Sequence, residues 1–402
     1  MIDRPAYLKQ ILPFVGKNII KILVGVRRSG KSTLLGQIKD HLIDHGVPES
    51  SIITMNLESA RFADITDAHA LQSYVHEHQA ESGKTYAFFD EIQEVDGWEK
   101  ALRSFMVDYD IDLYVTGSNA HLLSGELATH ITGRYVQIPV YPFSFEEYLR
   151  ATSAEDSDAS RSEAFRDYLD MGGFPFRYDL DFQREPSLKY LTDIYGTILL
   201  KDVVQRNAIR DANQLERILD YAMEQVGHTL SAKSISDYLK SDRRSVSVDT
   251  VYGYLKAAED ACLLHKVQRE DAIGKKMLRF NEKYYVVDQG LREARGFSNT
   301  NAVDQVLENI VFIELLRRGY RVTVGKVGDR EIDFVAEKNG EREYYQVAYL
   351  LAAEETIERE FSVLEAVPDN FPKFVLSLDE FQPSRNGIRG INLIDWLLKG
   401  ND

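Results

Sequence analysis

Cysteine is nearly absent from this sequence. Cys262 is the single cysteine among 402 residues, so the sequence excludes an internal disulfide and zinc sites built from several cysteines. Its apolar neighbours indicate a small buried hydrophobic residue. No apolar run approaches the ~18 residues of a membrane-spanning helix, and the first residues do not read as a signal peptide. We therefore expect a cytoplasmic protein that does not enter a membrane.

The sequence also lacks an excess of positive charge. It has 48 Lys and Arg against 64 Asp and Glu, which gives a net charge of -16 and a pI of about 5.1. This balance excludes a protein that coats nucleic acid with its whole surface, but it allows a local basic face. The apolar content of 44% is normal for a globular protein, and the length predicts roughly two to four domains.

The most informative pattern lies near the amino end. Residues 25–32 read GVRRSGKS, which matches the phosphate-loop pattern G-x-x-x-x-G-K-[ST]. An apolar, β-branched stretch precedes the loop and predicts a buried strand, and a helical apolar spacing follows it. Loop amides and the start of a helix attract phosphate. The residues predicted to hold the phosphates of ATP are Gly25, Ser29, Gly30, Lys31, Ser32 and Thr33.

Two adjacent acids end the short apolar strand predicted at residues 86–89. Asp90 and Glu91 form the pattern in which the first acid helps to hold magnesium and the second orients and deprotonates water. With the Ser32 hydroxyl, Asp90 gives a predicted Mg²⁺ site. Solvated loop charges are the alternative interpretation of this pair.

Two further positions are candidates for catalysis. Asn119 follows the strand predicted at 111–115 and could sit between the γ-phosphate and water, with Ser118 as its rival and an ordinary turn as the alternative. Arg134 precedes another predicted strand and could reach a γ-phosphate, its own or a neighbour's, or form a structural ion pair.

These motifs resemble a known family. The stretches GVRRSGKST, YAFFDEIQ, TGSNAHLLS, TGRYVQIPVYPFSFEEY and GGFP follow the order found in prokaryotic AAA-type ATPases that carry a C-terminal domain of unknown function. The resemblance covers nearly the whole chain. It implies binding and hydrolysis of ATP, a cytosolic location, and assembly into rings or dimers.

The predicted fold class is α/β in four parts. A P-loop AAA-type core with a parallel sheet is expected at 1–150, a helical lid at 151–210, a winged helix-turn-helix at 211–295 and a small restriction-endonuclease-like domain at 296–402. The polar stretch 151–163 is expected to be a solvated loop or a helix connection.

The winged part rests on three apolar helical patterns and a hairpin. The hairpin is predicted from residues 265–269 and 277–280, with Lys275 and Lys276 at its tip. Residues 231–289 contain eleven basic and nine acidic side chains, so this is the least acidic part of the chain. Contact with the phosphates of double-stranded DNA and docking against protein both remain open.

The last part resembles the restriction-endonuclease-like fold through Glu308 on a predicted helix and Asp333 on a predicted strand. That family ends its third strand with acid-x-Lys, whereas this chain has Gln346-Val347-Ala348. The lysine that would activate water is missing, so an inactive nuclease fold is predicted. Whether Glu308 and Asp333 bind metal is left open.

The leading hypothesis is a Mg²⁺-dependent ATP hydrolase that drives a conformational change or remodelling of a partner, with DNA as a candidate. The alternative is a nucleotide-controlled switch or protein-interaction module with slow turnover. An active nuclease and a small-molecule kinase are less favoured, the latter because paired acids favour water as the acceptor.

Overall fold

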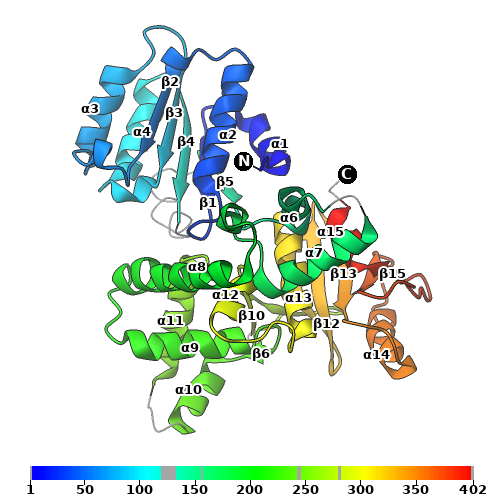
Figure 1. The fold of residues 1–402 in the computed structure, drawn as a ribbon. Helices are drawn as coiled ribbons and strands as arrows, with labels where there is room; N and C mark the ends of the chain where they lie inside the picture. Colours follow the sequence, from blue (N-terminus) through cyan, green and yellow to red (C-terminus); the bar gives the residue numbers. More distant parts are fainter. Residues whose placement is uncertain (1, 119–132, 155–156, 242–245, 279–281, 400–402) are drawn as a thin grey trace. The chain divides into compact units, whose positions relative to one another are not determined.

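The chain is described here by a computed structural model that covers residues 2–118, 133–154, 157–241, 246–278 and 282–399 (Figure 1). It divides into two compact units. The first comprises Met1–Tyr141 with Asp260–Cys262, and the second comprises Pro142–Glu259 with Leu263–Asp402. The finer division into four parts stays a prediction. In the covered ranges, every helix is too short or too polar to cross a membrane.

The first unit contains a sheet of five parallel strands in the order β2-β3-β4-β1-β5. This arrangement confirms the α/β class predicted for the amino-terminal part. The strands are β1 (Ile20–Val24), β2 (Ile52–Asn56), β3 (Thr85–Asp90), β4 (Ile111–Gly117) and β5 (Tyr135–Pro139). The helices are α1 (Pro5–Ile11), α2 (Lys31–Asp44), α3 (Ala68–His78) and α4 (Trp98–Asp108).

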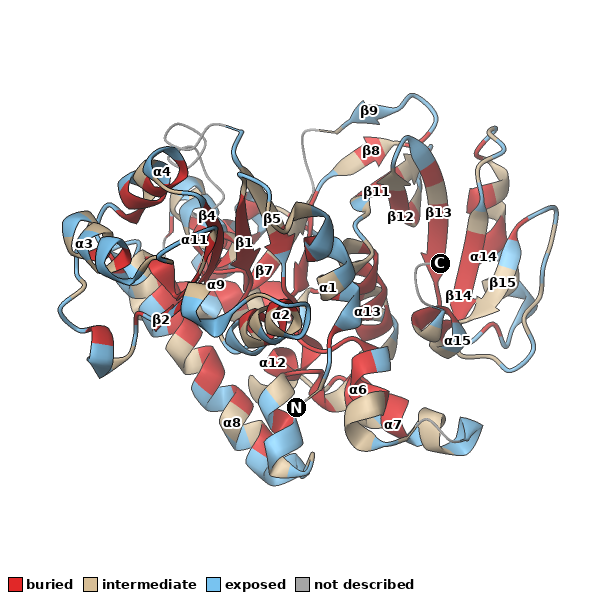
Figure 2. Cartoon of the chain, turned by 90° about the horizontal axis from the view of Figure 1, so that it is seen from above, coloured by how far each residue is buried: buried red, intermediate tan, exposed pale blue. Residues whose placement is uncertain are grey.

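Helices cover both faces of this sheet, as Figure 1 shows. Apolar residues of α1 and α2 pack in one cluster with Phe88 and Tyr114, whose rings stack 4.6 Å apart. On the other face, Phe89 packs against Phe105 of α4. Because both faces are covered, β1 and β4 are buried along their whole length (Figure 2). Burial on both faces explains the continuous apolar runs of the sequence.

The parallel direction brings the ends of the strands to a common edge. Gly25 follows β1, Asp90 ends β3, and Gly117 ends β4. Ligands of open parallel sheets bind outside these carboxyl ends. The opposite, amino edge is fixed by a buried ion pair between Lys21 and Asp112.

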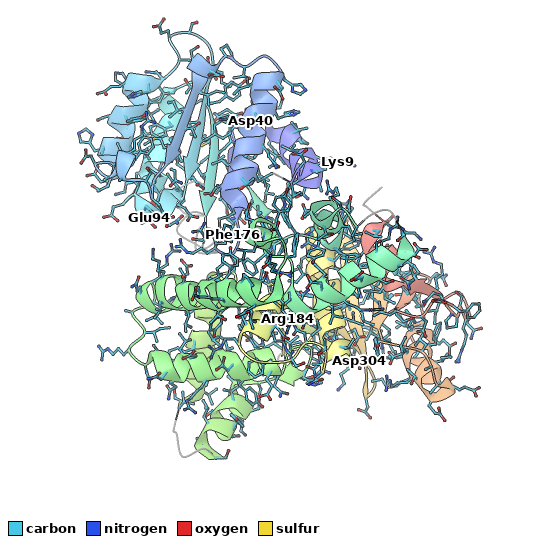
Figure 3. The ribbon with its side chains drawn as sticks, viewed as in Figure 1. Lys9, Asp40, Glu94, Phe176, Arg184 and Asp304 are labelled. Atoms are coloured by element: carbon cyan, nitrogen blue, oxygen red, sulfur yellow. The ribbon has the colours of Figure 1, made fainter. Side chains whose placement is uncertain are left out.

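The second unit begins with helices. They are α6 (Phe145–Thr152), α7 (Asp158–Met171), α8 (Arg184–Thr197) with its π-helical continuation Ile198–Gln205, α9 (Ala212–Glu224), α10 (Ala232–Ser241), α11 (Val248–Asp260) and α12 (Gln289–Ala294). Arg184, labelled in Figure 3, ties three of these helices together, since it pairs with Asp170 of α7 and, at 2.8 Å, with Glu293 of α12.

The predicted polar connection at 151–163 is only partly correct. A capping box of Ser144 and Glu147 starts α6 at Phe145, before this stretch. However, Ser157 accepts a hydrogen bond from the Ser160 amide and starts α7 at Asp158, inside the predicted loop. The local cap and the later apolar positions of α7 outweigh the polar composition of its first turn.

The glycines of the GGFP stretch have a tertiary role. Gly173 and Gly290 donate their amides to the Asp288 carboxylate at 2.7 and 2.8 Å. A Cβ on Gly172 would lie 1.8 Å from the same carboxylate. Residue 172 must therefore be glycine because the end of α7 lies against the cap of α12.

The predicted hairpin is present but is built differently. The strand β7 (Leu264–Val267) pairs with β10 (Glu282–Val286), in a three-stranded sheet with β6 (Thr229–Leu230). Between β7 and β10, the strands β8 (Arg269–Asp271) and β9 (Lys276–Met277) leave this sheet and pair with each other, so a hairpin turns at the predicted Lys275. Met277 of the predicted second strand lies in β9, and residues 279–280 lie outside the described residues. The strand β8 also pairs with the distant β11, which the local pattern did not predict.

The carboxyl-terminal sheet has seven strands in the order β15-β14-β13-β12-β11-β8-β9. Its strands include β11 (Arg321–Val327), β12 (Arg330–Lys338) and β13 (Glu341–Val347). Asp333 lies in a strand, as predicted, and Gln346-Val347 ends β13. The other strands are β14 (Lys373–Ser377) and β15 (Arg389–Asn392), and the helices are α13 (Val303–Arg317), α14 (Glu354–Glu365) and α15 (Leu393–Leu398). A core cluster joins α14 to this sheet through Phe361 and Val375.

Candidate functional site

The predicted phosphate loop lies at the carboxyl edge of the five-stranded sheet. A Cβ on Gly25 would lie 2.1 Å from the Val140 carbonyl oxygen, so close backbone approach requires glycine here. Gly30 caps the amino end of α2, and Ser32 and Thr33 are exposed in its first turn. The Ser29 hydroxyl is buried and, within the covered ranges, has no hydrogen-bond partner. The loop thus presents polar groups that a ligand can satisfy.

Lys31 is the first residue of α2 and is buried. Its Nζ donates hydrogen bonds to the carbonyl oxygens of Gly25 at 3.0 Å and of Val26 at 3.1 Å. Burial lowers the pKa of Lys31, although the Glu91 carboxylate lies 3.9 Å away. The ammonium group is therefore short of negative charge, a condition that an added phosphate would relieve.

Asp90 lies where the sequence predicts, beside the phosphate loop. Its Oδ1 accepts hydrogen bonds from the hydroxyls of Ser32 at 3.1 Å and of Thr116 at 2.6 Å. Burial raises the pKa of the Asp90 carboxyl, while these two hydrogen bonds act in the opposite direction. The structure thus brings together Ser32 and Asp90, the two predicted magnesium ligands, although they are 58 residues apart.

Glu91 is held in an unusual backbone conformation. Its φ is +54°, in the left-handed region, which costs a residue with a side chain ~1–3 kcal/mol. Burial acts to raise the pKa of its carboxyl, but Lys31, Gln93 and Arg27 outweigh burial and leave the pKa below its ordinary value. The carboxylate is thus charged at neutral pH, as a base must be.

Two hydroxyl side chains, Thr116 in β4 and Ser118 just after it, hold Asp90 and Glu91 in place. The Thr116 hydroxyl oxygen accepts the Glu91 amide at 2.9 Å while it donates to Asp90. The Ser118 hydroxyl donates to Glu91 Oε2 at 3.1 Å. Sequence reasoning assigned no role to Thr116, and the polar ending of an otherwise apolar strand was the signal that could have found it.

Arg4 is a second residue that sequence reasoning missed. It is 1% exposed, and its guanidinium donates to the carbonyl oxygens of Ser29 at 3.0 Å and Tyr141 at 2.9 Å. It also lies over the Tyr7 ring at 4.4 Å. Arg4 therefore supports the phosphate loop from behind, and no local motif announces such a contact.

The remaining two candidates do not join the site as described. Asn119 lies outside the described residues. The carbonyl of Arg134 accepts the Ile20 amide at 2.9 Å, and Tyr135 pairs with Ile20, so Arg134 lies at the amino edge of the sheet. The length of a strand, about 15 Å, separates it from the loop at the carboxyl edge. Its action on a neighbouring molecule's nucleotide stays a prediction.

The donor set fits magnesium and a polyphosphate. Mg²⁺ takes oxygen ligands, and the adjacent oxygens of Ser32 and Asp90 are of this kind. Phosphate fits the buried cation of Lys31, the buried hydroxyl of Ser29 and the first turn of α2. All of these groups come from the loop and the strand end that carry the sequence motifs.

The second predicted site, at Glu308 and Asp333, contains a lysine that was not expected there. Lys283 of β10 donates to Glu308 at 2.8 Å and lies 2.6 Å from Glu331. Burial acts to lower the pKa of Lys283, but its acidic neighbours outweigh burial and raise the pKa above its ordinary value.

The rest of this cluster is internally bonded. Asp333 accepts the Val347 amide at 2.8 Å, and Gln346 donates to Glu360 at 2.6 Å. Among the described residues, no group of three or more His, Cys, Asp or Glu is arranged to hold a metal ion. The network is typical of a structural ion cluster, and the inactive nuclease fold remains our prediction.

Sequence comparison assigns the chain to a family. Residues 17–149 match the model of an AAA domain, and residues 162–301 match a domain of unknown function (DUF8612). An uncharacterised protein of Haemophilus influenzae is 39% identical over 402 residues, which cover 99% of both chains. This chain belongs to the same family as the Haemophilus protein. Its amino-terminal part is a nucleotide-binding domain of AAA type, which contains the site above.

More distant relatives are also similar. An uncharacterised protein of Methanocaldococcus jannaschii is 29% identical over 348 residues, covering 84% of this chain and 73% of its own length. Among solved structures, the RuvB Holliday junction branch migration motor of Thermotoga maritima gives a TM-score of 0.33 at 15% identity, over 66% of this chain and 90% of its own. The Aeropyrum pernix ORC1 protein in complex with DNA gives 0.30 at 13%, over 75% and 94%. Scores this low decide neither fold nor function.

Proposed function

We propose that the AAA domain hydrolyses ATP and that hydrolysis drives a conformational change in a bound partner. The observation that carries this proposal is the convergence of Lys31, Asp90 and Glu91 at one sheet edge, with Glu91 charged and its carboxylate 3.9 Å from Lys31, beyond hydrogen-bond distance. The side chains of Lys31 and Glu91 can act together on a triphosphate whose γ-phosphorus lies between them.

The proposed reaction is the transfer of the γ-phosphoryl group to water. The water oxygen bonds to the γ-phosphorus as the bond to the β,γ-bridging oxygen breaks, ADP leaves, and the water proton goes to Glu91. Ser118 and Gln93 orient the Glu91 carboxylate through their hydrogen bonds. Lys31 neutralises charge on the phosphate oxygens.

Magnesium, when bound, would be held by Ser32 and Asp90 and would neutralise phosphate charge. Thr116 holds Asp90 by a hydrogen bond of 2.6 Å and so fixes the orientation of the carboxylate. Protein hydrogen bonds of this kind orient metal ligands.

The experiment that tests this function measures phosphate release with ATP and Mg²⁺. We expect turnover by the purified chain, and a fall of about 10²-fold or more in Glu91→Gln, because the base is removed. Calorimetry should show that Glu91→Gln still binds ATP. If the unaltered chain binds no ATP, the function is wrong; if Glu91→Gln turns over normally, the role of Glu91 is wrong.

We propose double-stranded DNA as the partner, contacted by residues 231–289. Lys233, Lys256 and Lys276 are exposed there, in the least acidic part of the chain. The exposed face of α11 carries Asp249, Tyr252 and Gly253, which supports phosphate contact without base readout.

Titration of duplex DNA at several salt concentrations tests this partner. We expect binding that weakens steeply with salt and does not depend on sequence. Binding that is absent at low salt would exclude DNA and favour a nucleotide-controlled switch that docks on protein. Slow turnover that changes little with any DNA would favour the same alternative.

A further inference from the structure

Arg27 lies inside the phosphate loop, where its charge helps to lower the pKa of Glu91. Its Nη1 donates to Glu58 Oε1 at 3.0 Å, and the Arg27 side chain is 13% exposed. Two residues before Glu58, β2 ends at Asn56, which is paired with Asp90 of β3. The Leu57 amide also donates to the Asp90 carbonyl at 3.1 Å. Glu58 therefore holds the Arg27 guanidinium at the edge of the sheet where the site lies.

The charge of Arg27 acts on both reacting sides of the site. It favours the charged form of Glu91 and disfavours the charged form of Lys31. Since the Leu57 amide bonds to the Asp90 carbonyl, the Glu58 carboxylate holds the guanidinium beside the strand end that carries both acids. The γ-phosphate is proposed above to lie at this strand end.

The contact with Glu58 is one that a phosphate can displace. Glu58 is 42% exposed, and an ion pair with an exposed partner is weak. A γ-phosphate carries more charge and can accept two parallel hydrogen bonds from a guanidinium. It therefore competes well with the Glu58 carboxylate for this guanidinium.

We infer that Arg27 exchanges Glu58 for the γ-phosphate of ATP and stabilises the charge that develops during hydrolysis within its own chain. Glu58 competes for the same guanidinium and weakens the binding of ATP relative to ADP. This inference rests on the proposed ATP hydrolysis. In this arrangement Arg27 supplies the positive charge at the γ-phosphate. Arg134 lies at the opposite edge of the sheet and cannot supply that charge to the site of its own chain.

The test compares Arg27→Ala, Arg27→Lys and Glu58→Gln in phosphate release and in the binding of ADP and of a non-hydrolysable ATP analogue. We expect kcat to fall by about 10²-fold or more in Arg27→Ala. This loss of kcat is smaller than the loss found when an arginine supplied by a second protein is removed. Affinity for the analogue should fall, and affinity for ADP should not change. Arg27→Lys keeps the positive charge but loses the paired N–H donors of the guanidinium, so its kcat and its analogue affinity should lie between those of the unaltered chain and Arg27→Ala.

The Glu58→Gln variant provides the matched control. It should bind the analogue about 2- to 5-fold more tightly, since a weak competing ion pair is removed. In the Arg27→Ala background, Glu58→Gln should not change the affinity for the analogue, because no guanidinium remains for Glu58 and the phosphate to compete for. Turnover per chain should not depend on protein concentration.

Two results would overturn the inference. One is an equal loss of ADP and analogue binding in Arg27→Lys, which would assign Arg27 to loop structure. The other is normal kcat in Arg27→Ala. These outcomes differ from failure of the proposed function, in which the unaltered chain itself neither binds nor hydrolyses ATP.

Discussion

Lys31 in the first unit and Lys283 in the second are both buried lysines close to carboxylates, yet their surroundings differ. Lys283 has two carboxylate oxygens at 2.8 and 2.6 Å, and its pKa is raised. Lys31 has two carbonyl oxygens and a carboxylate 3.9 Å away, and burial lowers its pKa. Lys283 is stabilised as a cation by the fold, and Lys31 is not.

This difference separates a structural charge from a functional one. A buried cation that is fully paired holds elements together, here β10 with α13 and β12. A buried cation whose carboxylate neighbour lies beyond hydrogen-bond distance, as for Lys31, is held ready for a ligand that brings more negative charge. The four predictions below test this distinction, in order of decreasing free energy.

The largest effect is expected from Lys283→Ala. Removal of this lysine leaves Glu308 and Glu331 as half-buried acids without their cation, which should lower the free energy of unfolding by about 3–5 kcal/mol. Urea denaturation measures this change. Lys266→Ala in the same three-stranded sheet is the control. The ion pair of Lys266 with Glu282 is partly exposed, so its loss should lower the free energy of unfolding by less than about 1 kcal/mol. Equal losses in both variants would erase the distinction.

Lys31→Ala should show the reverse behaviour. We expect kcat for ATP to fall by about 10²- to 10³-fold, because a cation at the phosphate is lost. The free energy of unfolding should change little, since the fold does not stabilise this charge. Phosphate release and urea denaturation measure the two effects, with Lys39→Ala on the same helix as the control. A large loss of stability without loss of turnover would contradict the assignment.

The third prediction extends the comparison to a buried acid. Burial raises the pKa of Asp288 from 3.8 to about 6, against the hydrogen bonds of two backbone amides. Because the pKa of Asp288 is higher in the folded than in the unfolded chain, its contribution to the free energy of unfolding is complete below pH ~4. This contribution is lost as the pH rises through ~6. Relative to Asp288→Asn, the wild type should gain about 2–3 kcal/mol of unfolding free energy between pH 7 and pH 4. Parallel stability curves for the two proteins would exclude this.

The smallest effect is expected at Arg4. Arg4→Lys keeps the charge but cannot hold the Ser29 and Tyr141 carbonyls together, so the phosphate loop should be less ordered. We expect ATP and ADP affinities to fall alike by about 10-fold, or ~1.4 kcal/mol, unlike the selective loss expected for Arg27. Calorimetry measures both, and Lys9→Ala on the exposed side of α1 (Figure 3) is the control. Unchanged affinities would remove Arg4 from the site.

Much of the fold followed from local pattern. The apolar strands around the phosphate loop and the strand that carries Asp333 were predicted because their residue pattern acts within a few residues. Within the hairpin predicted at 265–280, the turn around Lys275 is present between β8 and β9. Local pattern does not encode the second pairing of β8, with β11 ~50 residues further along the chain.

The sequence by itself determined the phosphate loop and the acid pair Asp90-Glu91, because a strand, a glycine turn and a strand-ending acid are local features that a parallel sheet brings to one edge. Tertiary structure decided how these groups are held and charged. Arg4, Thr116 and Lys283 reach their partners across ~25 residues or more of chain. Burial and the neighbouring charges, which together set the pKa shifts of these groups, exist only once the chain has folded.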